Sequence, residues 1–478
     1  MFDTRRRFQK SAVALSLVAV LTAGMGLSPA NATPANFDRD PNPIDLGYMD
    51  FPTSRQDSDF IANQLDPVDL YLPEKTGERP GYSDFFRPRI NVDPWFFDDP
   101  VKAAEYELGD VIETRESLYG QVWYPGSRNI QIRYRSTDSR GYPMIASALL
   151  VIPPHATPNS NVFVWAQPIN AVGADCGVVA AMNRPSWGSF DTLAGVGAVP
   201  ALAAGFPVLL PDSTGPRNSY VINRLSSHVI LDGIRMTRKQ TEFQLNDSKF
   251  VVLGISHGGL QVGYTAAEQP YYAPELTDVI NRFVIHEGAP DLIKLAQSFG
   301  LYGNMAEYPA FYGGFFISYL ISAAREYGDK VPYFEQWLTD YGREQLKKHR
   351  SLCLPFNTVA GAGVRLPEFF KEGFYESKTF RTLMQVAKDN SLMYYPGTPK
   401  VPTMFVHGTT DGILYQHKDD KFLWNKWCDA GANVGYLEIP FGTHFTTIRR
   451  SVPQITSFLV AGLKEEPAEN MCGKVLEE

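Results

Sequence analysis

The sequence predicts an α/β fold, with a mostly parallel central sheet and helices on both of its faces. Short apolar segments rich in β-branched and aromatic residues recur along the chain, and segments with a helical apolar period separate them. Such continuous apolar strands are typical of a parallel sheet that is buried on both sides. The 478 residues are 44% hydrophobic and 20% charged, so the chain can bury a large core and is not wholly disordered.

The alternation of strands and helices runs to about residue 290 and resumes near residue 400. Turn signals separate the first strands, and helical segments separate the later ones. The expected strands are 122–124, 130–134, 144–152, 161–165, 207–210, 250–253, 283–285, 403–406 and 436–439. The expected helices in this core are 193–204, 228–235, 258–268 and 452–463.

The N-terminus has the features of an export signal. Basic residues at 5–7 and 10 precede an apolar run, 12–27, that is short for a membrane span, and a small-x-small site follows at 30–32. An ordinary secretory signal and a twin-arginine signal both fit this pattern. We therefore expect residues 1–32 to be removed and the protein to be secreted or held at the cell envelope. No later stretch is long and apolar enough to span a bilayer.

The charge and the cysteines of the mature chain exclude some partners. Removal of the signal takes away four basic residues and one acidic residue, so the net charge changes from −8 to −11. An acidic protein is a poor ligand for nucleic acid phosphates, so we expect no nucleic-acid partner. An even number of cysteines in an exported chain favours disulfides over metal ligation or catalysis, and no zinc-ribbon spacing occurs, so we expect no metal. The four cysteines allow three pairings; they are Cys176, Cys353, Cys428 and Cys472.

A helical insertion is expected to divide the core, as a cap or lid between strands 6 and 7 of the fold. Ten of its aromatic residues fall within 33 positions. Most should form the insertion's own core, and a minority could face an acyl chain or a lipid surface. These aromatics are Tyr302, Tyr308, Phe311, Tyr312, Phe315, Phe316, Tyr319, Tyr327, Tyr333 and Phe334. The expected division is a signal at 1–32, an irregular extension at 33–90, the core at 91–290 and 396–465, the insertion at 291–395 and a tail at 466–478.

One pentapeptide carries the strongest chemical signal. Residues 254–258 read GISHG, with a strand directly before them and a helical pattern directly after. A strand–turn–helix elbow of this kind holds a serine in a strained turn with its hydroxyl exposed, and small glycines let the neighbouring backbone approach. We interpret Ser256 as a nucleophile. The alternative is a glycine-rich turn with a surface serine.

A serine hydroxyl needs a base within hydrogen-bond reach and an acid that orients this base. Such an elbow is typical of the α/β-hydrolase fold, in which the order along the chain is Ser, acid, His. Asp411 follows an expected strand 155 residues after Ser256, and His444 follows the last expected strand 33 residues later. The order and the positions past strand ends predict the triad. Asp419 and Asp420 are the alternatives for the acid.

The other histidines fit the base less well. His407 ends the strand before the acid and should pack below the site, and His417 begins a helix. His257 follows the nucleophile and is expected to give its backbone N–H to an oxyanion hole. The second donor is expected in the loop after strand 161–165, where Asn170 and Ala171 lie and no His-Gly-Gly-Gly run occurs. His155, His228, His286 and His349 fall outside the last loop.

Over roughly residues 90–465 the chain resembles the secretory lipases of the fungal lipase A type, which also occur in exported actinobacterial proteins. The matching segments are 93–96, 108–112, 134–138, 211–216, 231–235 and 272–276. The resemblance implies a lidded α/β hydrolase that cleaves carboxylic esters, often with long acyl chains, without a cofactor. It also implies disulfides Cys176–Cys353 and Cys428–Cys472. The family tends to place an Asp in the oxyanion-side loop, where this chain has Asn170 and Ala171.

The leading functional hypothesis is therefore a lipase or carboxylesterase that acts on lipid-like esters through an acyl-enzyme on Ser256. An alternative is an acyltransferase that moves the acyl chain to a sugar or another alcohol, using the same acyl-enzyme. A peptidase of this fold fits the resemblance less well. A non-catalytic envelope protein on the same scaffold is a hypothesis from another class, and the presence of a serine, an acid and a histidine in the right order disfavours it.

Overall fold

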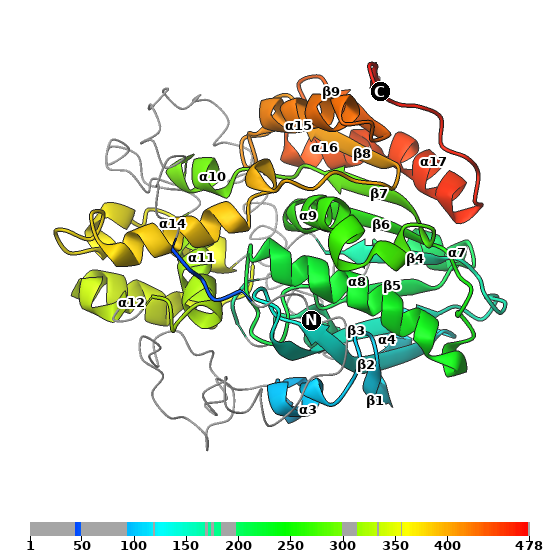
Figure 1. The fold of residues 1–478 in the computed structure, drawn as a ribbon, viewed down its shortest axis with the longest axis horizontal. Coiled ribbons are helices and arrows are strands. Elements are labelled where there is room, and N and C mark those ends of the chain that lie inside the picture. The colour runs from blue at the N-terminus through cyan, green and yellow to red at the C-terminus, as the bar shows by residue number, and fades with distance from the viewer. Residues whose placement is uncertain are drawn as a thin grey trace, which may run out of the picture.

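A ten-stranded sheet organises the molecule, with helices on both of its faces (Figure 1). The computed structural model describes residues 44–48, 93–117, 120–167, 171–173, 176–182, 197–298, 313–331, 334–354 and 356–476. The expected signal at 1–32 and all of the extension 33–90 except 44–48 lie outside these residues. Within 44–48, the hydroxyl of Tyr48 donates to a carboxylate oxygen of Asp389 at 2.7 Å, so this short part of the extension contacts the insertion.

The strand order is β1-β2-β3-β5-β4-β6-β7-β8-β9-β10. The first four strands in this order pair antiparallel, and all pairs from β5 to β10 are parallel. The parallel strands end at one edge of the sheet, where loops from distant parts of the chain meet. The strands are β1 Val111–Glu116, β2 Arg128–Thr137, β3 Pro143–Ile152, β4 Val162–Ala166, β5 Val208–Pro211, β6 Phe250–Ile255, β7 Ile280–His286, β8 Thr403–Gly408, β9 Val434–Ile439 and β10 Val475–Leu476.

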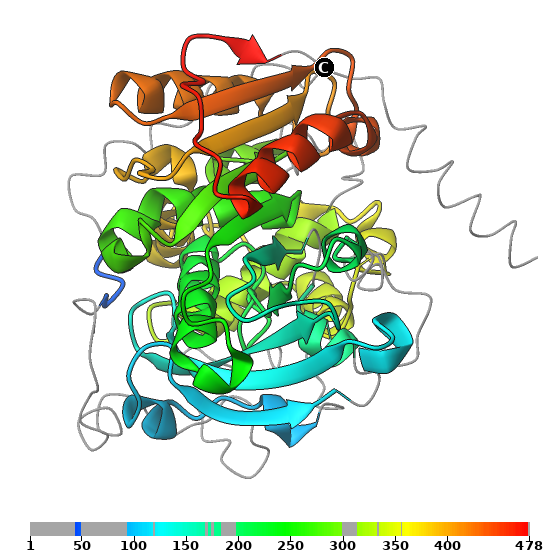
Figure 2. The same ribbon diagram turned by 90° about the vertical axis from the view of Figure 1, so that its right-hand side faces the viewer.

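Side chains of each central strand alternate between two apolar layers. In β6, Phe250 and Val252 join the layer that also contains helices α8, α9 and α15, whereas Val251 and Leu253 join the layer of α5, α7 and α17. Figure 2 shows α17 lying across the strands on the second face. Burial on both faces explains why these strands are continuously apolar. The core helices are α3 Pro100–Ala104, α4 Gly120–Trp123, α5 Val178–Ala181, α7 Val199–Ala203, α8 Asn223–Lys239, α9 His257–Tyr272, α15 His417–Asp429, α16 His444–Arg450 and α17 Val452–Leu463.

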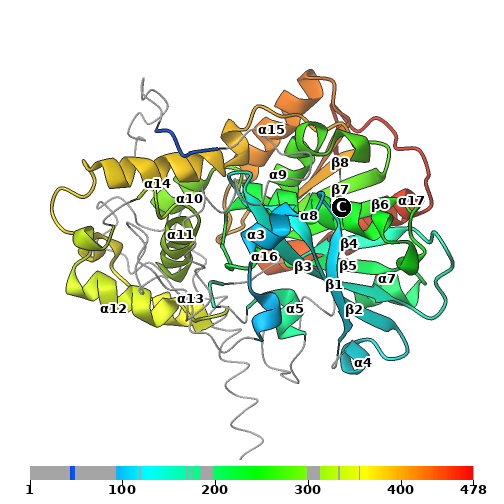
Figure 3. The same cartoon turned by 60° about the horizontal axis from the view of Figure 1, so that its bottom comes forward.

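Helices α10 to α14 lie between β7 and β8 and gather beside one end of the sheet (Figures 1 and 3). Most aromatic side chains that the structure describes here are buried in the insertion's own packing, including Phe316, Tyr319 and Phe334. The single-turn 3-10 helices are η3 Pro94–Phe96, η4 Thr241–Phe243, η5 Pro274–Leu276, η7 Phe334–Trp337, η8 Leu366–Phe369 and η9 Leu392–Tyr394. The helices of this part are α10 Leu292–Ser298, α11 Gly313–Glu326, α12 Asp340–His349, α13 Phe356–Gly361 and α14 Lys378–Asp389.

The segment after β5 joins the insertion to the core. The backbone N–H of Tyr220 donates to the Ser322 hydroxyl at 2.7 Å on α11. Arg217 bonds Glu326 of α11 at 3.0 Å and Asp98 of the N-terminal part at 3.2 Å, and both carboxylates are buried. One buried guanidinium thus ties three separate stretches of chain together.

Two disulfides make further connections. Cys176–Cys353 links the loop after β4 to the insertion, and Cys428–Cys472 links α15 to the C-terminal tail. Beyond the second disulfide, β10 adds parallel to β9 and completes the sheet. No helix within the described residues is long and apolar enough to cross a membrane.

One expected element is wrong and several have other bounds. Residues 122–124 were expected as a strand, but α4 occupies Gly120–Trp123. The Gln121 side chain bonds the Ser127 carbonyl at 2.5 Å and accepts from the Gly126 N–H at 2.9 Å, which closes a local turn that competes with strand pairing. Of the helix expected at 193–204, the structure shows α7, and 193–196 lie outside the described residues.

Candidate active site

Ser256 stands in a sharp turn between β6 and α9. Its backbone has a positive φ of 57°, a conformation that costs energy for a residue with a Cβ and that is found at functional turns. The turn is possible because two glycines flank it. A Cβ on Gly254 would lie 2.0 Å from the Gly258 carbonyl oxygen, and one on Gly258 would lie 2.2 Å from the Ala166 carbonyl oxygen at the end of β4. The sequence G-x-S-x-G is therefore a packing requirement of this elbow.

His444 is the first residue of α16, directly after the turn that follows β9. Thr443 caps this helix: its hydroxyl oxygen accepts from the Thr446 backbone N–H, and the Thr446 hydroxyl oxygen accepts from the Thr443 backbone N–H. The cap fixes where the helix begins and hence where the imidazole points. His444 Nε2 lies 3.0 Å from Ser256 Oγ, and Nδ1 lies 2.8 Å from Asp411 Oδ2. The structure thus brings together the three side chains that the sequence singled out.

Asp411 lies in the loop after β8 and is oriented by its own backbone. Its Oδ1 accepts from the N–H groups of Ile413 at 2.8 Å and Leu414 at 2.9 Å, which leaves Oδ2 for His444. Burial alone would raise the pKa of Asp411, but the charge and hydrogen bond of His444, with help from His407, hold it well below the usual range. The carboxylate is therefore ionised at neutral pH.

The alternative acids have other partners. Asp420 Oδ2 lies 2.6 Å from His407 Nδ1, and Asp419 forms an ion pair with Lys294 at 2.5 Å. His407 Nε2 donates to the Leu414 carbonyl at 2.7 Å, so both of its nitrogens face acceptors. Burial opposes the charge, but Asp420 raises the pKa of His407 to about 9. A buried imidazolium thus packs below the site, 3.6 Å from Asp411 Oδ2.

The His257 side chain points into the protein, where Nε2 accepts from the Val221 N–H at 3.2 Å. Burial lowers its pKa to about 3, so the ring is neutral. The ring packs on Tyr220 with centroids 4.3 Å apart, and Tyr220 stacks on Phe315 of α11 at 6.0 Å. The backbone N–H of His257 is the first of α9, where helical N–H groups lack an acceptor in their own helix and favour negative charge.

The opposite wall of the expected oxyanion hole is only partly described. Ala171 is fully buried, whereas Asn170 lies outside the described residues. Gln167, at the start of this loop, is also buried, and neither atom of its side-chain amide has a hydrogen-bond partner in the described part of the chain. An unpaired buried amide at this edge is a further possible donor toward a bound substrate.

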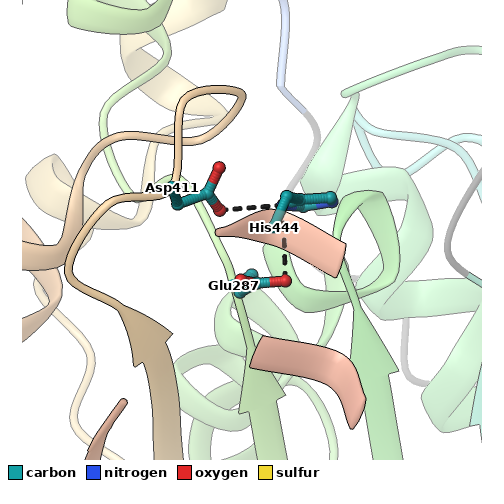
Figure 4. Close-up of side chains that lie close together, drawn as sticks. All are labelled: Glu287, Asp411 and His444. Atoms are coloured by element: carbon teal, nitrogen blue, oxygen red, sulfur yellow. Dashed lines mark hydrogen bonds and ion pairs between the residues drawn. The ribbon is translucent and has the colours of Figure 1, made fainter. Parts of the chain in front are cut away.

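Glu287, which the sequence analysis did not single out, also faces His444. It follows β7 directly, and its Oε2 lies 3.3 Å from His444 Nδ1 (Figure 4). One nitrogen of His444 and one carboxylate oxygen each of Glu287 and Asp411 lie within 4.8 Å of one another, a spacing that would also suit the ligands of a metal ion. A metal at Nδ1 would replace the 2.8 Å hydrogen bond to Asp411. A proton on Nδ1 is donated to Asp411 and leaves Nε2 free to accept from the Ser256 hydroxyl, so this tautomer fits both contacts. We therefore assign the three residues to a proton-bonded group.

This arrangement has the parts needed for acyl transfer. An imidazole that accepts from a serine hydroxyl and donates to a carboxylate can remove the hydroxyl proton during attack and return it to a leaving group. The elbow presents the hydroxyl at a helix N-terminus, where developing negative charge is stabilised. Ser256 is only 9% exposed and His444 only 5%, so the group is largely covered.

A family model described as secretory lipase matches residues 192–470. Among curated proteins, Lipase 9 of Candida albicans is 26% identical over 425 residues, which cover 83% of this chain and 88% of that protein. A secreted triacylglycerol lipase of Malassezia globosa is 25% identical over 407 residues, covering 81% and 84%.

Solved structures show a similar fold. Candida antarctica lipase A superposes with a TM-score of 0.71 at 18% identity, over 81% of this chain and 89% of that one. The rice cell wall degrading esterase of Xanthomonas oryzae superposes with a TM-score of 0.56 at 16% identity, over 75% of this chain and all of the other. The ten-stranded sheet described above is thus an α/β-hydrolase sheet, as the sequence predicted.

Proposed function

Because the chain belongs to the secretory lipase family, we propose that Ser256, His444 and Asp411 are the catalytic triad with which it cleaves lipid esters. The protein is a secreted lipase of the α/β-hydrolase fold. One observation carries the assignment of the residues: a continuous chain of hydrogen bonds of 3.0 and 2.8 Å runs from Ser256 Oγ through His444 to Asp411. The family favours ester hydrolysis over acyl transfer or a non-catalytic role.

The proposed reaction has two stages. Ser256 Oγ attacks the ester carbonyl carbon while His444 Nε2 takes its proton, and Asp411 stabilises the imidazolium through Nδ1–H. The tetrahedral oxyanion accepts a hydrogen bond from the His257 N–H and from a second donor across the site. The imidazolium then gives its proton to the leaving alcohol, which departs. In the second stage a water molecule, deprotonated by His444, attacks the acyl carbon, and His444 returns the proton to Ser256 Oγ as the fatty acid leaves.

The test of the triad compares hydrolysis of p-nitrophenyl esters, from acetyl to palmitoyl, by the wild type and by four variants. Ser256→Ala and His444→Ala should each lower kcat by about 10⁴-fold or more, because the triad acts as a unit. Asp419→Asn is the matched control for Asp411→Asn, since Asp419 pairs with Lys294 on the surface and not with His444. If Ser256→Ala keeps wild-type rates, or Asp419→Asn loses as much as Asp411→Asn, the assignment is wrong.

We also propose that the insertion 291–395 is a lid whose exposed apolar face contacts the lipid surface. Ser256 is only 9% exposed, so a bulky ester must displace part of the cover to reach its hydroxyl. On α13, Phe356 is 62% exposed and Val359 is 60% exposed, and residues three apart lie on the same side of a helix. Apolar side chains that face water in this way favour adsorption to a lipid–water interface.

The lid proposal is tested by comparing two substrates. Phe356→Ser/Val359→Ser should lower the rate on emulsified triacylglycerol several-fold and leave the rate on a dissolved short-chain ester unchanged, because only the emulsion requires adsorption. Phe422→Ser is the matched control, since Phe422 is 57% exposed on α15, outside the insertion. Equal losses on both substrates, or equal losses in the control, would contradict a specific lipid contact.

A further inference from the structure

Glu287 faces the orienting side of the triad from a second strand. β7 and β8 are neighbours in the sheet, so the residues that follow them, Glu287 and Asp411, reach the same space. Both carboxyl groups are directed at one nitrogen: Asp411 Oδ2 lies 2.8 Å and Glu287 Oε2 3.3 Å from His444 Nδ1 (Figure 4). Like Ser256, Glu287 has a positive φ, here 48°, although it carries a side chain.

The backbone around Glu287 keeps it in this strained conformation. Its N–H donates to the Val406 carbonyl oxygen of β8 at 2.8 Å, so the residue is held by the neighbouring strand. A non-glycine residue with positive φ costs of order 1 kcal/mol or more, and such residues persist where the surroundings fix them. In this conformation the Glu287 carboxyl faces the imidazole of His444.

Two buried carboxylates cannot both stay ionised around one imidazole proton. When two carboxyl groups share a site, one of them keeps a proton because the two negative charges repel. Burial, followed by the Asp411 charge, raises the pKa of Glu287 well above its usual range. Within the described residues, no hydrogen bond of ordinary geometry reaches either Glu287 oxygen. The His407 charge and the Thr447 hydroxyl favour an anion at Glu287 but do not offset its burial.

The remaining groups around Glu287 support the same division of charge. His286 Nδ1 lies 3.5 Å from Glu287 Oε2, but burial lowers the pKa of His286 to about 3, so it brings no positive charge. His407 is charged, yet it lies beside Asp411, 3.6 Å from Oδ2. The Thr447 hydroxyl also faces Glu287 from α16 and carries no charge. The positive groups therefore favour the anion at Asp411 and the neutral acid at Glu287.

We propose that Glu287 is a positioning residue of the triad, which shares one proton with Asp411 and is the reserve acceptor for the Nδ1–H of His444. In the wild type, the pair holds one proton and one negative charge, and Asp411 is the anion. When Asp411 is removed, Glu287 releases its proton to solvent and accepts from His444 in its place. The proposal rests on the assignment of Ser256, His444 and Asp411 as the triad.

The experiment is a double-mutant cycle on a dissolved p-nitrophenyl ester. Loss of the acid alone costs about 10⁴-fold in triads without a substitute. Here Asp411→Ala should lose only about 10²-fold in kcat/KM, and adding Glu287→Gln should lose about a further 10²-fold. In the presence of Asp411, Glu287→Gln should cost only about threefold, because a neutral amide replaces a neutral acid. The effect of Glu287→Gln thus depends strongly on Asp411.

The pH profile separates this role from a structural one. In Asp411→Ala, Glu287 must ionise before it can orient His444, so the acid limb of kcat/KM should move to higher pH than in the wild type. In the double variant no carboxyl group remains to be ionised beside Nδ1, so the limb should move back to lower pH, while melting temperatures show whether all four proteins are folded. If Asp411→Ala does not fold, Asp411→Asn replaces it, since an amide cannot supply the anion either.

The outcomes distinguish the two proposals. If Glu287→Gln costs the same factor with and without Asp411, or if the acid limb of Asp411→Ala does not move, Glu287 is not a reserve acceptor. The Ser256→Ala protein, measured in parallel, gives the background rate. If the wild type is no faster than this background, the triad itself is wrong; if it is faster and the cycle is additive, only the role of Glu287 fails.

Discussion

Gly258 is the point at which the elbow packs most tightly on the neighbouring strand, and Gly258→Ala tests whether this contact sets the catalytic geometry. The added Cβ would lie 2.2 Å from the Ala166 carbonyl oxygen and 2.8 Å from that of Gln167. Both atoms belong to the backbone, so no side-chain rotation relieves the clash. Because carbon and oxygen need more than 3 Å, the first turn of α9 and the end of β4 must separate by about 1 Å.

This displacement falls between Ser256 and the loop expected to hold the second oxyanion donor. A misplacement of about 1 Å can cost about 10²-fold in rate, and overpacking a core contact typically costs about 1–3 kcal/mol of stability. We therefore expect Gly258→Ala to lower kcat/KM by about 10²-fold and to lower the melting temperature by several degrees. Ester hydrolysis with a dissolved substrate and calorimetry measure the two effects.

Gly412→Ala is the matched control, because it also changes a glycine next to a triad residue. A Cβ at Gly412 meets no atom within 4 Å, so activity and melting temperature should stay close to those of the wild type. Wild-type kcat/KM in Gly258→Ala would refute the reasoning, since the backbone would then have absorbed the clash without moving the site. A loss of the same size in Gly412→Ala would show that any methyl group near the triad is harmful.

Arg217→Met removes a cation that two buried carboxylates share and should lower the free energy of unfolding by about 3–5 kcal/mol, whereas Arg365→Met, with an exposed partner, should cost under about 1 kcal/mol; equal losses in urea unfolding would contradict this. Because burial lowers the pKa of His257 to about 3, the unfolded chain binds a proton below pH 6.5 that the folded chain does not, so stability falls as pH drops from 6.5 toward 3. His257→Asn should reduce the slope of unfolding free energy against pH by about 1.4 kcal/mol per pH unit. An unchanged slope in urea titrations at pH 6 and 4.5 would show that His257 is not the buried neutral group. Replacing Cys176 and Cys353 by serine removes a cross-link between residues 177 positions apart and should lower the free energy of unfolding by about 2–5 kcal/mol. The melting temperature measures this effect, and an unchanged melting temperature would contradict it.

The central strands could be predicted because burial on both faces makes them apolar without interruption. β4, β6 and β8 are of this kind, and because all three are parallel their carboxyl ends lie at one edge of the sheet. The strand that leads into Ser256 and the helix that leaves it gave the elbow a local signature. Order along the chain then directed attention to Asp411 and His444.

Other features depend on contacts that no local pattern contains. β10 is only two residues long and becomes a strand because the tail is held against β9. Residues 122–124 have β-forming side chains, yet the Gln121 bonds close a turn there instead. Glu287 was missed although a signal existed, since it directly follows the parallel strand β7, beside the loop after β8 that holds Asp411. The chain order of a triad requires only one acid, so it does not point to a second carboxyl group at the same edge.

The two outer strands have a consequence for how the protein behaves at high concentration. An unpaired strand edge is a template on which another chain can add its own strand and start aggregation. At one border, β1 has a register irregularity and charged residues at Glu113, Arg115 and Glu116. At the other border, β10 covers β9 with a strand too short to recruit a neighbour. Reduction of Cys428–Cys472 would remove the covalent link that holds this cover and leave it to the hydrogen bonds of Asn433 and of β10 itself, so we expect the reduced protein to aggregate more readily at high concentration.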